Sequence, residues 1–228
     1  MVHLDAGRII EALAVTSTLV ERDGASAQSQ EAHALVLLAE AARLDGLDQS
    51  EQATFSRHSA LNCYQIACSV STKPQLLQLS TAQLAHMIDA IPTATKYYTL
   101  AHENVINDAR ASFFLAQIEL INSRWDTAKV WITESMVRNP NEPFALLSLA
   151  LIEAQLGNAS VAIELANKGC GILPEEPNLR FIQARVFRLA GRPEQALEIL
   201  IALPKTIQDS EMCRGEFDSC LDAIKNAE

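Results

Sequence analysis

Apolar residues recur every three or four positions through most of this chain, which is the period of an amphipathic helix. Short stretches with glycine, proline or polar residues interrupt that period. No alternation of apolar and polar residues is long enough to predict a strand. The pattern therefore predicts an all-α protein. Helices are expected over 4–22, 30–44, 51–71, 75–89, 94–107, 109–122, 125–138, 143–156 and 159–170, from 177 onward, and over 193–203 and 210–226.

A 34-residue unit repeats along the chain, most clearly at 109–142 and 143–176, and small residues keep its phase over a longer stretch. Small side chains at fixed positions allow the helices of a hairpin, and neighbouring hairpins, to approach closely. Three columns with this spacing therefore predict a stack of helical hairpins. The columns are Ala60, Ala94, Ala128, Ala162 and Ala196; Ala82, Ala116, Ala150 and Ala184; and Ala67, Ala101, Ser135 and Gly169.

This unit resembles the tetratricopeptide repeat, a helix–turn–helix with a Leu–Gly/Ala pair, a turn glycine, an alanine and an aromatic residue, and a final proline. The matching positions are Leu115, Ala116, Trp125, Ala128 and Pro140; Leu149, Ala150, Gly157, Ala162 and Pro174; and Ala184, Phe187, Gly191 and Ala196. The chain departs from the pattern at Ser123, which replaces the turn glycine, and at Thr81 and Gln183, which replace the leucine. The resemblance implies a right-handed α-α superhelix, a solenoid of about 11–12 antiparallel helices.

The register of the 34-residue repeat divides the chain into three predicted regions. Residues 1–74 are expected to form divergent N-terminal helical hairpins, continuous with the array and of undefined pairing. Residues 75–208 hold four repeats, at 75–108, 109–142, 143–176 and 177–208. Residues 209–228 are expected to form a C-terminal capping helix that covers the end of the array. Its apolar side is expected to carry Met212, Phe217, Leu221 and Ile224.

In such an array the first helix of each repeat lines the concave face. Tetratricopeptide arrays that hold a C-terminal carboxylate use Lys, Asn and Arg there, whereas the equivalent positions here are mostly apolar. The resemblance thus implies a groove for an apolar or amphipathic protein segment; the alternative is that these side chains only pack against neighbouring helices. The groove residues are Leu79, Gln83, Met87, Phe113, Phe114, Gln117, Phe144, Leu147, Leu151, Phe181, Arg185 and Arg188.

The composition narrows the classes of partner and compartment. With 28 acidic and 18 basic residues the net charge is −10, which opposes nucleic-acid binding. We expect no signal peptide in the first residues, and no run approaches the roughly 20 apolar residues of a membrane helix. The five cysteines lack CxxC spacing, and three of them lie among apolar residues of expected helices, which suits small buried apolar groups in a reducing compartment. We therefore expect a cytoplasmic protein without membrane insertion.

No constellation predicts catalysis. His58 and Cys63 lie on different faces of a helix, no HExxH or phosphate-binding loop occurs, and no metal or cofactor is expected. Trp125 and Trp131 suit inter-helix packing, with partner contact as the alternative. The leading interpretation is a non-catalytic scaffold, adaptor or assembly factor. A chaperone for a secreted or assembling substrate, and a self-associating subunit such as a homodimer, stay open.

Overall fold

The computed structural model describes residues 6–24, 26–105 and 108–226, which form thirteen helices and no strand. The predicted all-α repeat architecture is confirmed. The chain divides into two compact units, Met1–Ile106 (unit 1) and Asn107–Glu228 (unit 2). Within the described residues, every helix is too short or too polar to cross a bilayer.

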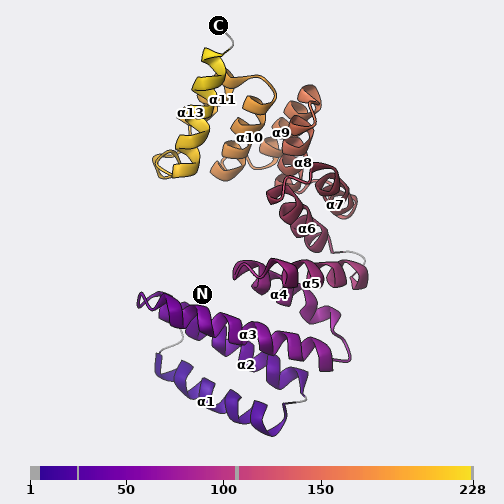
Figure 1. Cartoon of the computed structure of the whole chain (residues 1–228), viewed down its shortest axis with the longest axis vertical. Helices are drawn as coiled ribbons and strands as arrows, with labels where there is room; N and C mark the ends of the chain where they lie inside the picture. Colours follow the sequence, from indigo (N-terminus) through magenta and orange to yellow (C-terminus); the bar gives the residue numbers. More distant parts are fainter. Residues whose placement is uncertain (1–5, 25, 106–107, 227–228) are drawn as a thin grey trace. The chain divides into compact units, whose positions relative to one another are not determined.

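Unit 1 consists of two helical hairpins and one additional helix. Helices α2 and α3 form the first hairpin and α4 and α5 the second, while α1 packs on α2, and α3 packs on α4 (Figure 1). This arrangement defines the pairing that the sequence left open before residue 75. The bounds are Ala6–Arg22 for α1, Ala27–Asp45 for α2, Ser50–Val70 for α3, Gln75–Met87 for α4 and Ile91–Asn104 for α5.

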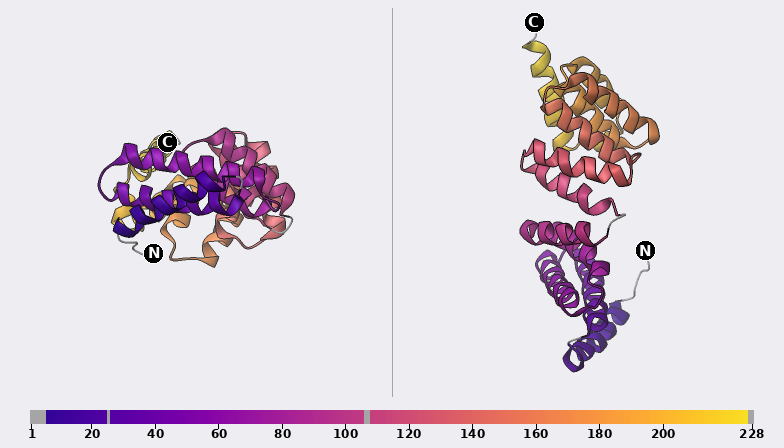
Figure 2. Two further views of the ribbon diagram at one scale, coloured as in Figure 1. Left: turned by 90° about the horizontal axis from the view of Figure 1, so that it is seen from below. Right: turned by 90° about the vertical axis from the view of Figure 1, so that its right-hand side faces the viewer.

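Unit 2 contains three successive hairpins, α6–α7, α8–α9 and α10–α11, followed by α12 and α13 (Figure 2). The first helices lie side by side, because α8 contacts both α6 and α10, and α13 covers α10 and α11. The bounds are Arg110–Ile121 for α6, Trp125–Arg138 for α7, Pro143–Gln155 for α8, Ala159–Ile172 for α9, Pro177–Leu189 for α10, Pro193–Ile201 for α11, Lys205–Gln208 for α12 and Glu211–Lys225 for α13.

The columns of small residues lie where helices touch. All nine alanines of the first two columns have 0% exposed surface, and the four members of the third column are buried as well. A larger side chain at any of these positions would push two helices apart. The sequence period therefore identified buried contact positions in the hairpins α4–α5, α6–α7, α8–α9 and α10–α11.

Gly169 in α9 shows how close this approach becomes. A Cβ atom added at Gly169 would overlap Leu147 Cδ2 and lie 3.2 Å from the Pro143 carbonyl oxygen. Leu147 is fully buried and has little room to move aside. By contrast, a Cβ atom at Gly171, further along the same helix, would meet nothing within 4 Å.

We expect Gly169→Ala to lower the free energy of unfolding by about 1–3 kcal/mol, since it overpacks a filled interface. Gly171→Ala is the matched control and should leave stability unchanged or raise it by up to about 1 kcal/mol, through helix propensity. Urea unfolding followed by tryptophan fluorescence measures both, because the chain's two tryptophans, Trp125 and Trp131, lie in α7 of unit 2. Equal effects of the two substitutions would contradict the close contact.

The turns between the two helices of each hairpin repeat with the period of the sequence. Positive φ angles occur at Asp89 (60°), Ser123 (56°), Gly157 (83°) and Gly191 (73°), which occupy the same position in four successive repeats. At every one, the amide of this residue and that of the next close the end of the first helix; Arg124 N, for example, donates to Glu119 O at 2.9 Å. The turn conformation is thus a property of the repeat and does not require glycine.

The turn of the first hairpin departs from this spacing. Its positive-φ residue is Asp48, which precedes Asp89 by more than one repeat, although Ala60 still precedes Ala94 by one repeat. The physical reason is the length of α3, whose 21 residues add about two turns before Ala60. Ala60 in the second helix therefore keeps the repeat spacing of the array, whereas the turn residue Asp48 does not.

A left-handed backbone costs a residue other than glycine roughly 1–2 kcal/mol, which glycine's greater entropy loss partly offsets. We therefore expect Ser123→Gly to raise the free energy of unfolding by about 0.5–1 kcal/mol. Gly157→Ala, at the equivalent turn, should lower it by about 1 kcal/mol, although no atom lies within 4 Å of the added Cβ. Denaturation midpoints with unchanged m-values measure both effects, and a destabilising Ser123→Gly would overturn this account of the turn.

Three local expectations need correction. Helix α5 begins at Ile91 and not near residue 94, because Pro92 is tolerated in a first turn whose amides need no partner. The short helix α12 follows Pro204 and was not predicted. In α13 the predicted apolar side is shifted: Met212 is 69% exposed, whereas Cys213, Glu216 and Cys220 are buried. With α12 the count becomes thirteen within the described part of the chain.

Candidate partner-binding groove

The predicted groove residues fall into both units. Three of them lie at successive turns of α4 in unit 1, where Leu79 is half-buried and Gln83 and Met87 are exposed. The other nine lie on the first helices of the three hairpins in unit 2. These are Phe113, Phe114 and Gln117 on α6; Phe144, Leu147 and Leu151 on α8; and Phe181, Arg185 and Arg188 on α10.

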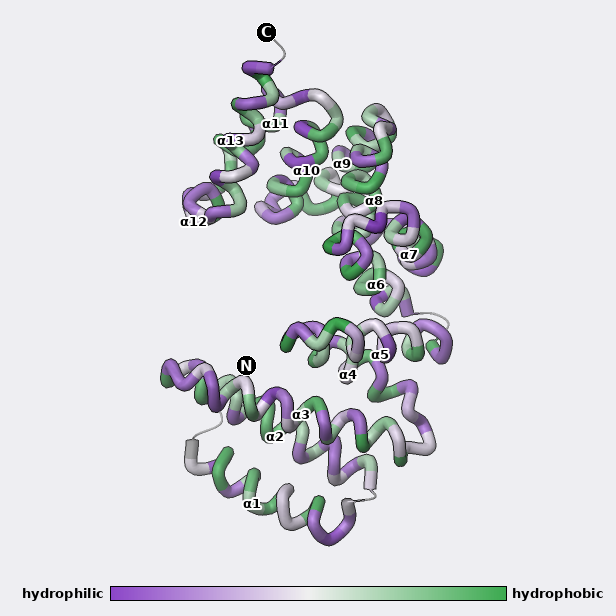
Figure 3. Tube along the Cα trace, in the orientation of Figure 1, coloured by the Kyte–Doolittle hydropathy of each residue, from purple (hydrophilic) through white to green (hydrophobic). Residues whose placement is uncertain are grey.

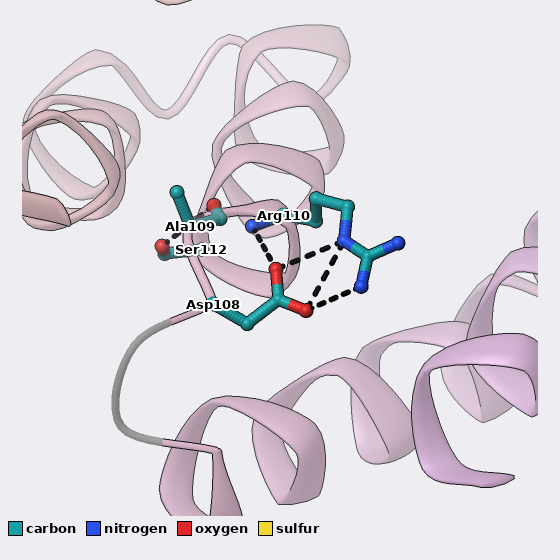
Figure 4. Close-up of polar contacts among 4 residues, drawn as sticks. All are labelled: Asp108, Ala109, Arg110 and Ser112. Atoms are coloured by element: carbon teal, nitrogen blue, oxygen red, sulfur yellow. Dashed lines mark hydrogen bonds and ion pairs between the residues drawn. The ribbon is translucent and has the colours of Figure 1, made fainter. Parts of the chain in front are cut away.

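The start of α6 is held by polar contacts that orient its first turns. The Asp108 carboxylate accepts bonds from the Arg110 backbone amide at 2.9 Å and from its guanidinium, Nη2 to Oδ2, at 2.6 Å (Figure 4). Arg110 thereby lowers the pKa of Asp108 below its usual value. Ser112 donates to the Ala109 carbonyl oxygen, and so does Ser135 of α7, at 2.9 Å. The second of these bonds ties α7 to the beginning of α6.

Phe113 and Phe114 follow directly. Both are half-buried, and their rings meet edge to face with centroids 5.5 Å apart. Neighbouring residues on a helix point about 100° apart, so the core of one hairpin cannot enclose both rings.

The C-terminal halves of α6, α8 and α10 form a pocket of about 400 Å³ in unit 2. Three of the predicted residues line it, Gln117, Leu151 and Arg185, which occupy the same position in three successive repeats. A second set of equivalent positions lies one helical turn further on. This set is Ile121, Gln155 and Leu189, and the remaining lining residues are Leu120, Ser123 and Trp125.

Hydrogen bonds fix one polar group of this pocket. Gln117 Nε2 donates to Ser148 Oγ at 2.8 Å, and Ser148 in turn donates to the Phe144 carbonyl oxygen at 2.7 Å. Gln117 is therefore held in one orientation by α8. Arg185 is exposed, and within the described part of the chain no carboxylate forms an ion pair with it.

Leu147 is not available to a partner. It has 0% exposed surface and belongs to the core cluster of α8, α9 and α10. Helix α8 is apolar on nearly every side (Figure 3), so the sequence could not separate its core face from its outer face. Phe144 and Phe181, both half-buried, likewise pack on core clusters. Leu151, one turn after Leu147, also packs on this cluster, but it lines the pocket together with Gln155.

Arg188 serves the capping helix. Its guanidinium pairs with the Glu216 carboxylate of α13 through Nε to Oε1 and, at 3.2 Å, Nη2 to Oε2. The hydrogen bond to Glu216 raises the pKa of Arg188. The prediction that Arg188 faces the groove missed this partner because Glu216 lies 28 residues later in the chain.

The pocket residues that the sequence did not predict lie at helix ends and turns. They are Leu120, Ile121, Ser123 and Gln155, with Trp125 predicted mainly as a packing residue. The repeat spacing of Ile121, Gln155 and Leu189 was the available signal. Lys129 of α7 pairs with the buried Glu153 of α8 at 2.8 Å, outside the pocket lining, and this contact lowers the pKa of Glu153.

Groups that could perform chemistry lie elsewhere and are mostly buried. All five cysteines are free and buried, more than the three expected, and burial raises the pKa of each thiol, that of Cys220 to about 11. His33, His58 and Cys63 border a shallow depression of about 630 Å³ in unit 1, where His33 Nδ1 lies 2.8 Å from Thr16 Oγ1. Among the described residues, no three His, Cys, Asp or Glu side chains are grouped closely enough to hold a metal ion.

We expect Arg188→Met to loosen the docking of α13, because it leaves the Glu216 carboxylate, whose side chain is 8% exposed, without its cation. The cost should be about 1–3 kcal/mol, at the lower end since Arg188 is partly exposed. Hydrogen exchange of the amides in Glu211–Lys225 measures this loss. Arg185→Met, at a nearby position on the same helix, should leave that exchange unchanged; similar protection in the two variants would contradict the assignment.

No protein-family model and no curated protein matches this chain. Among solved structures it is similar to a tetratricopeptide repeat protein from Parabacteroides merdae, with a TM-score of 0.67, 16% identity, and coverage of 97% of this chain and 86% of that one. It is also similar to YrrB, described as a TPR protein with an unusual peptide-binding site, with a TM-score of 0.58, 14% identity, and coverage of 94% of this chain and 100% of that one. A chain of the APC/C hetero-tetramer Cut9–Hcn1 matches with a TM-score of 0.60 and 18% identity. The match covers 95% of this chain and 46% of the length of that one. Similarity at such low identity shows the fold, and the chain therefore has the tetratricopeptide-repeat fold.

Proposed function

We propose that this protein is a non-catalytic interaction module that binds a segment of another protein across α6, α8 and α10. The observation that carries this proposal is the pocket built from two sets of equivalent positions, Gln117, Leu151 and Arg185, and Ile121, Gln155 and Leu189. Each repeat contributes the same two outward-facing positions, so a single extended site arises from the period of the fold.

The dimensions of the site suit a short peptide segment. Its volume of about 400 Å³ falls within the range of roughly 300–1,000 Å³ that ligand pockets occupy. Packed helix axes lie about 8–10 Å apart, so three neighbouring helices span about 20 Å. An extended chain rises about 3.3 Å per residue, and about six residues would therefore cross the site.

The chemistry of the lining suits an amphipathic segment. Leu151, Trp125 and Leu189 offer apolar surface, and Ile121 is 75% exposed at the edge. Gln117 and Gln155 supply amide groups that can bond to a partner backbone. The peptide-binding site in the description of YrrB, a protein of the same fold, supports this use of the fold.

A photo-crosslinking amino acid at position 121 tests the proposal in the native cell. Position 130 on the second helix α7 is the matched control, because Val130 is 67% exposed and does not line the pocket. We expect adducts with a partner protein from position 121 and not from position 130, and loss of those adducts when Leu151→Asp is added.

The mass of the adduct also identifies the kind of partner. A product of twice the chain's mass would assign the groove to self-association, whereas a heterologous product supports a scaffold, adaptor or chaperone. Equal adducts from positions 121 and 130, or adducts that persist with Leu151→Asp, would refute a groove on α6, α8 and α10.

A further inference from the structure

We infer that the segment bound in this pocket carries an aspartate or glutamate side chain, which pairs with Arg185 beside an apolar residue that contacts Leu151 and Leu189. This inference rests on the proposed function and adds the chemical class of the partner. It follows from the charges that surround the pocket.

Arg185 differs from most arginines of unit 2 in having no acidic partner within the described part of the chain. Arg188 pairs with Glu216, and Arg124 pairs with Glu119. In each pair the carboxylate balances the positive charge of the arginine. The same is true of Arg110, Arg138 and Arg214, which pair with Asp108, Glu134 and Asp209. The pocket lining contains Arg185 as its one formally charged side chain among the described residues. In a protein of net charge −10, an exposed cation inside a pocket without carboxylates is complementary to a partner's acidic group.

The helix ends beside the pocket do not cancel this charge. The C-termini of α6, α8 and α10 carry partial negative charge, which would favour a cation from the partner. Carbonyls in the last turn of each helix, however, already accept bonds from the turns: Leu120 O from Ser123 N, Ala154 O from Gly157 N, and Arg188 O from Gly191 N, at 3.0–3.1 Å. The effect of a helix end also falls off within one turn, whereas the guanidinium of Arg185 carries a full charge.

The position of Arg185 favours an acidic side chain over a chain terminus. Leu189 lies one turn beyond Arg185 on α10 and also lines the pocket, so the apolar surface continues past the cation. A segment that contacts both Leu189 and Arg185 on α10 therefore need not end at the cation, and an acidic side chain within it can reach Arg185. The contact is charge-assisted and can be bidentate, because the planar guanidinium presents two parallel N–H groups to a carboxylate.

Selection from a random peptide library tests the inference. The peptides are fused to a phage coat protein through their C-termini, so that no free terminal carboxylate is available. We expect the wild-type protein to enrich sequences with a large apolar residue and an Asp or Glu within about six positions, the length that spans the site. The Arg185→Glu variant should enrich Lys or Arg in place of the acid and keep the apolar residue.

Arg192→Glu provides the matched control. Arg192 is an exposed arginine in the turn after α10, outside the pocket, and its reversal makes the same change in net charge. It should retain the acidic preference. A synthetic peptide of the wild-type consensus should bind Arg185→Ala about tenfold more weakly, as expected for the loss of one charge-assisted bond. Added salt should reduce that difference.

The outcomes separate the two proposals. A wild-type consensus without an acid, or an acidic preference that survives in Arg185→Glu or is lost in Arg192→Glu, overturns the inference and leaves the groove intact. Binding seen only with peptides that have a free C-terminus also overturns it. If the wild-type protein enriches no consensus, or Leu151→Asp enriches the same one, the groove itself is refuted and the inference falls with it.

Discussion

Close contact between helices, at positions that hold no side chain larger than a methyl or hydroxymethyl group, is the constraint on which this structure depends. The backbone of α9 approaches α8 so closely at Gly169 that a Cβ atom would meet Leu147 and the Pro143 carbonyl. The fully buried alanines fix the separation of the other helices in the same way. Because the hairpins α4–α5, α6–α7, α8–α9 and α10–α11 close on the same positions, their remaining surfaces also repeat at this spacing along the chain.

That repetition explains how the pocket forms from residues far apart in the chain. Gln117, Leu151 and Arg185 share one position in three repeats, and the side-by-side arrangement of α6, α8 and α10 brings them together. Contacts between repeats hold this arrangement: Gln117 bonds to Ser148, and Lys129 pairs with Glu153. The positions of the pocket residues are therefore set by the packing of the repeats.

The fold could be predicted from the sequence because its signal is periodic and local, as the buried columns containing Ala128 and Ala116 show. The site could be predicted only in part. Helix α8 is apolar all round, so no pattern distinguishes Leu147 in the core from Leu151 at the pocket. The contact of Arg188 with Glu216 could not be predicted, because Glu216 lies on a helix outside the repeat. Because α3 is long, the turn of the first hairpin does not keep the repeat spacing that its second helix keeps. A sequence comparison at one fixed spacing cannot detect such a turn.

The equivalence of Gln117, Leu151 and Arg185 also has an evolutionary consequence. Each repeat contributes one residue to this row of equivalent positions. A change in a single codon can therefore alter what the pocket binds without changing the neighbouring residues that pack the helices. Tandem duplication of the DNA for 143–176 would insert one more leucine into the row and keep the flanking glutamine and arginine in register. Selection could thus lengthen or retune this surface in discrete steps, which a site assembled from unrelated loops would not permit.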